Sequence, residues 1–166
     1  MSAPDDDALH AAAARLGERL RAARHVLVTA ESCTGGWIAK AVTDVPGSSE
    51  WFDCGMAAYS YEAKQALLGV NPHTLERHGA VSRECVVEMV SGALVHSGAT
   101  VAVAVTGIAG PGGGTPDKPV GTVWIAWKRR GGYPRAELFH FTGDRDAVRR
   151  QTVAAALHGL ELGAAA

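Results

Sequence analysis

The chain has 166 residues, a formal net charge of -1 and 47% hydrophobic residues, which is the size and composition of one ordinary domain with a real core. A charge this close to zero excludes the broad basic field that recruits nucleic acid or acidic membranes. The three cysteines are widely spaced and form no C-x-x-C pair, which argues against a disulfide framework or a zinc site.

The chain also shows no targeting or membrane signal. Acidic residues occupy 5–7, opposite to the basic start of a signal peptide, and no apolar stretch approaches the roughly 20 residues of a spanning helix. The seven histidines show no metal-ligand spacing. We therefore expect a single domain over 1–166, soluble and cytoplasmic, with no metal, no cofactor, no nucleic-acid partner and no membrane partner.

Apolar periodicity and turn residues predict alternating helices and strands. Helices are expected over 8–23, 34–44, 61–68, 72–78, 82–96 and 144–162. Strands are expected over 25–30, 51–59, 100–106, 120–127 and 136–141, the last two forming a hairpin. This order predicts an α/β fold, a three-layer α/β/α sandwich with a mixed, mostly parallel sheet.

The most informative segment is Thr29-Ala-Glu-Ser-Cys-Thr-Gly-Gly36, a polar turn between a predicted strand and a predicted helix. Such a junction lies at the carboxyl edge of the sheet, where open α/β sheets bind ligands. A helix N-terminus there would also offer backbone N–H groups to a developing oxyanion. Ser32 is therefore our candidate nucleophile for acyl transfer.

Polar residues follow two other predicted strands, at 59–64 and at 106–110. Because parallel strands end at one edge, we expect Tyr59 and Lys64 to converge on Ser32. A lysine base must lower its pKa from about 10.4 towards 7, roughly 4–5 kcal/mol of environmental bias. Either Lys64 is the base, or a charged Lys64 stabilises a Tyr59 phenolate that takes the serine proton; the residues do not choose between these.

Each candidate also has a purely structural explanation. Ser32 could cap the following helix, Tyr59 could be a half-buried strand aromatic, and Lys64 could lie on a solvated helix face. Cys33 reads more readily as a packing residue than as a nucleophile. The Gly- and Pro-rich segment 107–119 could be a connector. The simplest interpretation of three arginines is a solvated helix surface: Arg145, Arg149 and Arg150.

Taken together, the motifs resemble a known family. They are T-A-E-S-C-T-G-G at 29–36, V-P-G-S-S at 45–49, A-Y-S-Y-E-A-K at 58–64, L-L-G-V at 67–70, H-G-A-V-S at 78–82, V-T-G-I-A-G-P-G-G-G at 105–114, K-P-V-G-T-V at 118–123 and G-D-R-D-A-V-R-R at 143–150. This pattern is similar to the CinA C-terminal domain family, whose stand-alone members are nicotinamide-nucleotide amidohydrolases. One departure is Tyr61, where the family commonly has asparagine, and this could alter the pocket wall.

The resemblance implies hydrolysis of the carboxamide of nicotinamide mononucleotide (NMN) to nicotinic acid mononucleotide and ammonia, in pyridine-nucleotide recycling. It implies Ser32 as nucleophile, with Tyr59 and Lys64 as its activating partners. Because enzymes of this size are often symmetric oligomers, we also expect a homo-oligomer. The nucleotide would be bound or oriented by Thr34, Gly35, Ser48, Ser49, Thr106, Gly107, Gly110 and Arg145.

Two other functions stay open at this point. One is a non-catalytic nucleotide-binding module linked to competence or the DNA-damage response, although the chain lacks the basic footprint of a DNA binder. The other is a thiol enzyme that uses Cys33, for which the sequence shows no activating feature.

Overall fold

The computed structural model describes residues 2–164, which form one five-stranded sheet. The strands are β1 (Leu27–Glu31), β2 (Phe52–Ala57), β3 (Val101–Gly107), β4 (Thr122–Arg129) and β5 (Arg135–His140), in the spatial order β2-β1-β3-β4-β5. β1 pairs in parallel with both β2 and β3, whereas β4 is antiparallel to β3 and β5. The predicted mixed, mostly parallel sheet is confirmed.

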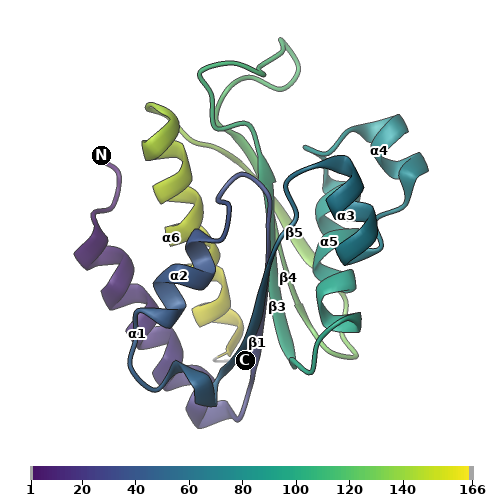
Figure 1. Cartoon of the computed structure of the whole chain (residues 1–166). Helices are drawn as coiled ribbons and strands as arrows, with labels where there is room; N and C mark the ends of the chain where they lie inside the picture. Colours follow the sequence, from purple (N-terminus) through teal and green to yellow (C-terminus); the bar gives the residue numbers. More distant parts are fainter. Residues whose placement is uncertain (1, 165–166) are drawn as a thin grey trace.

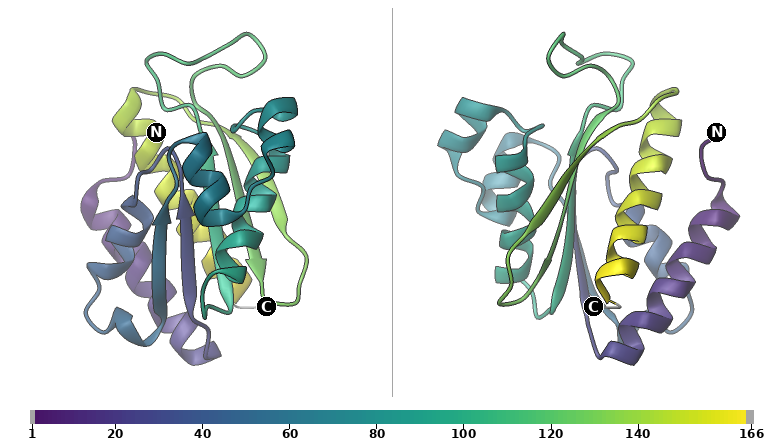
Figure 2. Two further views of the ribbon diagram at one scale, coloured as in Figure 1. Left: turned by 45° about the vertical axis from the view of Figure 1, so that its right-hand side comes forward. Right: turned by 180° about the vertical axis from the view of Figure 1, so that it is seen from behind.

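Helices cover both faces of this sheet (Figures 1 and 2). One face carries α1 (Asp6–Ala23), α2 (Trp37–Thr43) and α6 (Arg145–Ala164). The other carries α3 (Tyr61–Leu68), α4 (Pro72–His78) and α5 (Arg83–Val95). A 3-10 turn, η1 (Ser48–Glu50), precedes β2. The architecture is therefore the expected three-layer sandwich.

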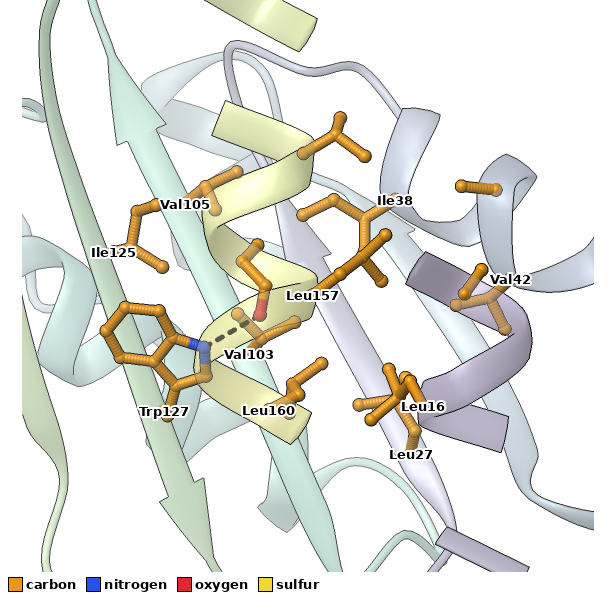
Figure 3. Close-up of a cluster of buried hydrophobic side chains, with 14 of the residues drawn as sticks. Leu16, Leu27, Ile38, Val42, Val103, Val105, Ile125, Trp127, Leu157 and Leu160 are labelled. Atoms are coloured by element: carbon orange, nitrogen blue, oxygen red, sulfur yellow. Dashed lines mark hydrogen bonds between the residues drawn. The ribbon is translucent and has the colours of Figure 1, made fainter. Parts of the chain in front are cut away.

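Two apolar cores lie on either side of the central strand β3. Because side chains alternate along a strand, Val101, Val103 and Val105 pack with α1, α2 and α6, whereas Ala102 and Ala104 face α5. Figure 3 shows the first core, in which Trp127 of β4 lies against α6 and its indole Nε1 donates to the Ala156 carbonyl at 2.9 Å. The larger side chains thus fix the α1–α2–α6 layer against the sheet.

Two helices have the predicted bounds because their ends are marked by strong local signals. Ser60 caps α3 by accepting from Ala63 N at 3.0 Å, and Gly69 ends it with a φ of 66°. Asn71 caps α4 by accepting from His73 N at 2.9 Å. No helix within the described residues is long and apolar enough to cross a membrane.

Different segments of the chain lie at the two ends of the parallel strands. β1, β2 and β3 run in one direction, so the segments that follow them meet at the carboxyl edge. The long loop between β3 and β4 projects from this edge, and α6 begins beside it (Figure 1). The predicted strand over 51–59 ends at Ala57, so Tyr59 lies in the loop beyond it rather than in the strand.

Candidate active site

Ser32 and Lys64 meet at the carboxyl edge. Ser32 follows the last residue of β1. Lys64 lies one turn into α3, the helix that follows β2. The Lys64 side chain is 1% exposed, and its Nζ lies 2.8 Å from Ser32 Oγ. The structure thus brings together two residues that are 32 positions apart in the sequence.

The Lys64 amine has three oxygen neighbours within hydrogen-bond distance. Besides Ser32 Oγ, these are the Ala58 and Tyr59 carbonyl oxygens, each at 2.9 Å. Burial lowers the pKa of Lys64 from its ordinary value, because desolvation disfavours the charged form. A neutral amine has two N–H groups and one lone pair. The two carbonyls can accept both N–H groups, which leaves the lone pair facing the Ser32 hydroxyl.

The loop that carries Ser32 is held from inside by Glu31, a buried carboxylate that is 1% exposed. Its Oε1 accepts from Thr34 Oγ1 at 2.6 Å and from Ile38 N at 2.8 Å. Its Oε2 accepts from Ala39 N at 3.0 Å and from Thr29 Oγ1 at 3.3 Å. Glu31 therefore satisfies the N-terminal donors of α2.

This arrangement corrects the expected helix start. α2 begins at Trp37 instead of residue 34, because Gly35 and Gly36 adopt φ values of 61° and 101° and a turn precedes the helix. Ser32 is therefore not the cap, and its own N–H donates to Val105 O at 3.0 Å. The expected helix N-terminus beside Ser32 is replaced by a turn, which leaves the serine hydroxyl to Lys64.

A cavity of about 270 Å³ opens beside the Ser32–Lys64 pair. It is lined by Ser32, Cys33, Tyr59, Lys64, Ala80, Val81, Thr106, Gly107, Ile108, Ala109, Gly110, Gly112, Gly113 and Arg145. Seven predicted site residues are thus in one place: Ser32, Tyr59, Lys64, Thr106, Gly107, Gly110 and Arg145. Sequence reasoning missed Ala80 and Val81, which carry no polar side chain to mark them.

Arg145 connects two walls of the cavity. Its Nη1 donates to Gly110 O at 2.8 Å, and its Nη2 donates to Tyr59 Oη at 3.1 Å. The Tyr59 side chain is 62% exposed, and its hydroxyl is paired with Arg145 rather than with Ser32 or Lys64. Thr106 is buried and donates to Ala80 O at 2.9 Å, so its hydroxyl ties β3 to the opposite wall.

Four predicted binding residues lie elsewhere. Thr34 is fully buried with its hydroxyl donated to Glu31, and neither it nor Gly35 lines the cavity. Ser48 and Ser49 lie in η1, which leads into Trp51, whose carbonyl accepts from the N–H of Leu27 at the start of β1. Because that is the amino edge of the sheet, these two serines lie away from the cavity within one chain.

Two further expectations concern Cys33 and Tyr61. Burial raises the pKa of the Cys33 thiol to about 12, so the thiolate that a thiol enzyme needs is strongly disfavoured. The Tyr61 hydroxyl accepts from Ala80 N at 3.3 Å, so this side chain supports the cavity wall from behind. Among the described residues, no three His, Cys, Asp or Glu side chains cluster as metal ligands would.

Comparison with known proteins places the chain in a family. The sequence model of the CinA C-terminal domain matches residues 9–162. The nicotinamide-nucleotide amidohydrolase PncC of Escherichia coli K12 is 53% identical over 148 residues, which cover 88% of each chain. The protein of the same name from Pseudomonas putida is 55% identical over 154 residues, 93% of this chain and 96% of that one.

Solved structures agree with this assignment. The competence/damage inducible protein CihA of Agrobacterium tumefaciens superposes with a TM-score of 0.93 at 41% identity, covering 100% of this chain and 99% of that chain. A CinA superfamily protein of Klebsiella pneumoniae gives a TM-score of 0.91 at 41% identity, covering 95% of this chain and 98% of its own. With family model, sequence and fold in agreement over most of its length, the chain belongs to the CinA C-terminal domain family.

Proposed function

We propose that this chain hydrolyses the carboxamide of NMN to nicotinic acid mononucleotide and ammonia, with Ser32 as nucleophile and Lys64 as its base. The observation that carries the proposal is the buried Lys64 amine 2.8 Å from Ser32 Oγ, with two backbone carbonyls as its other neighbours. The names of the PncC relatives support the substrate. We further propose a role in pyridine-nucleotide recycling, on family likeness, and a cytoplasmic homo-oligomer, because enzymes of this size are often symmetric oligomers.

The chemistry follows from the proton positions. Neutral Lys64 accepts the Ser32 proton as Oγ attacks the amide carbon, and the resulting ammonium then protonates the departing nitrogen. Ammonia leaves, and an acyl ester remains on Ser32. A water molecule then attacks the ester carbon while Lys64 accepts one of its protons. Lys64 passes this proton to Ser32 Oγ as the ester bond breaks, and the carboxylic acid product releases its own proton to solvent.

Lys64 is a better candidate for the base than Tyr59. Its amine is in contact with Ser32 Oγ, whereas the Tyr59 hydroxyl is bonded to Arg145. We assign Tyr59 and Arg145 to the nucleotide end of the cavity, where a guanidinium can bind a phosphate through two parallel hydrogen bonds. The Gly107 and Gly110 backbone lines the same cavity and allows close approach by a phosphate.

The test is ammonia release from NMN in the presence of EDTA. Ser32→Ala and Lys64→Met should lose turnover while keeping the circular dichroism spectrum of the folded protein. Tyr59→Phe should retain a larger kcat than Lys64→Met, and Ser97→Ala, which changes a serine between α5 and β3, should match the parent. Full turnover by Ser32→Ala would refute this mechanism. Saturable NMN binding without ammonia release would instead support the non-catalytic binding module.

A further inference from the structure

Arg149 of α6 holds the loop that carries the nucleophile. Its Nε donates to the Cys33 carbonyl and its Nη2 donates to the Thr34 carbonyl, both at 3.1 Å. The guanidinium also lies 5.0 Å from the ring centroid of Trp37, the first residue of α2. The solvated helix surface expected at this position is therefore wrong for Arg149, which binds two consecutive peptide carbonyls directly after Ser32.

These contacts fix the direction of the loop's peptide groups. In a trans peptide the carbonyl and the following N–H point in opposite directions, so the N–H of Thr34 points away from Arg149. The N–H of Ser32 is donated to Val105 O, and that of Gly35 to Ser32 O. Cys33 lines the cavity, and within the described part of the chain its N–H bonds no protein acceptor, so this N–H is available to an oxyanion; Thr34 is fully buried and does not line the cavity.

We propose that Arg149 is a positioning residue for acyl transfer, acting through the Cys33 and Thr34 peptides. These hydrogen bonds fix the two peptide groups that follow the Ser32–Cys33 peptide, and so limit the movement of the Cys33 N–H. The two hydrogen bonds also keep Ser32 Oγ within reach of the Lys64 amine. The inference rests on the proposed function, because it assigns Arg149 a role in the reaction of Ser32.

Arg150 provides a matched control on the same helix. It lies 4.9 Å from the same Trp37 ring, yet it pairs with Asp6 and Asp146 at the surface and is not bonded to the nucleophile loop. Arg149→Met and Arg150→Met therefore remove the same charge and a similar stacking contact. Only Arg149→Met removes the hydrogen bonds to the loop carbonyls, so the difference between the two isolates the positioning role.

The experiment measures two rates in the parent, Arg149→Met, Arg149→Lys and Arg150→Met. One is the rate at which a fluorophosphonate labels Ser32, followed by mass spectrometry, and the other is kcat and KM for NMN. We expect Arg149→Met to lower labelling and kcat about 10- to 100-fold with a smaller change in KM, because misplacement of a reacting group reduces the rate on this scale. Arg149→Lys should fall in between, and Arg150→Met should match the parent.

Each outcome decides the question. Equal labelling rates in Arg149→Met and Arg150→Met would overturn the inference, as would absence of Ser32 labelling in the parent. If Arg149→Met does not fold, the comparison of Arg149→Lys with Arg150→Lys takes its place, with thermal unfolding as the check. If the parent labels at Ser32 but releases no ammonia from NMN, the proposed substrate is wrong, and the labelling ratio still tests Arg149.

Discussion

Removing the charge of Glu31 tests the description of the nucleophile loop. In Glu31→Gln the side-chain volume is kept, but one carboxylate oxygen becomes an NH2 group. Oε1 accepts from Ile38 N and Oε2 from Ala39 N, so in either amide orientation one backbone N–H of α2 faces a donor. Losing a hydrogen bond to a charged acceptor and leaving a buried donor unpaired costs about 3 kcal/mol.

For a domain of this size, 1 kcal/mol shifts Tm by about 2–4 °C, so Glu31→Gln should lower Tm by about 6–12 °C. Thermal unfolding followed by circular dichroism measures this shift. Glu18→Gln is the control, because Glu18 lies on the exposed face of α1. If the two variants unfold at the same temperature, Glu31 does not hold the loop as described, and our account of how Ser32 is presented would fail with it.

Four shorter predictions concern the site and the core. The base must be neutral, and burial lowers the pKa of Lys64, so kcat/KM should rise with pH and the midpoint of that rise should lie below pH 10.5. A midpoint above pH 10.5 contradicts the assignment. Cys33→Ala should retain ammonia release, and its loss would restore the thiol as a candidate. Ser48→Ala should leave KM for NMN unchanged, and a large rise would bring the amino edge into the site. Gly92→Ala should lower the free energy of unfolding in urea by about 3 kcal/mol, since the new Cβ would lie 1.8 Å from the Leu68 carbonyl oxygen; an unchanged midpoint would contradict that packing.

Local signals explain which elements could be predicted from the sequence. Ser60 and Asn71 act as caps through their own side chains, so α3 and α4 can be recognised from neighbouring residues alone. The start of α2 is different, because its N-terminal donors are satisfied by Glu31 at the end of the preceding strand. A capping carboxylate that accepts from an N–H seven residues later has no simple sequence pattern, so the predicted start at residue 34 is too early.

The site residues likewise divide into those that the sequence predicts and those that depend on contacts between distant parts of the chain. The parallel strands end at one edge of the sheet and so place Ser32, Lys64 and Thr106 there, as the predicted strand order implies. Ser48 and Ser49 were assigned from family resemblance. Within one chain they lie at the amino edge, because a helix that crosses from β1 back to the start of the parallel strand β2 must end there. Arg149 was missed because its partners are more than 100 residues earlier in the chain.

The site draws its parts from both helical layers. α3, on one face of the sheet, brings Lys64 to Ser32 Oγ, whereas α6, on the other face, contacts the same loop through Arg149 and the cavity through Arg145. The sheet edge between them supplies Ser32 itself. Lys64 and Arg149 thus contact the loop from opposite helical layers. Loosening either interface should therefore reduce the reaction rate before the chain unfolds, because a reacting group tolerates far less displacement than a packed core does.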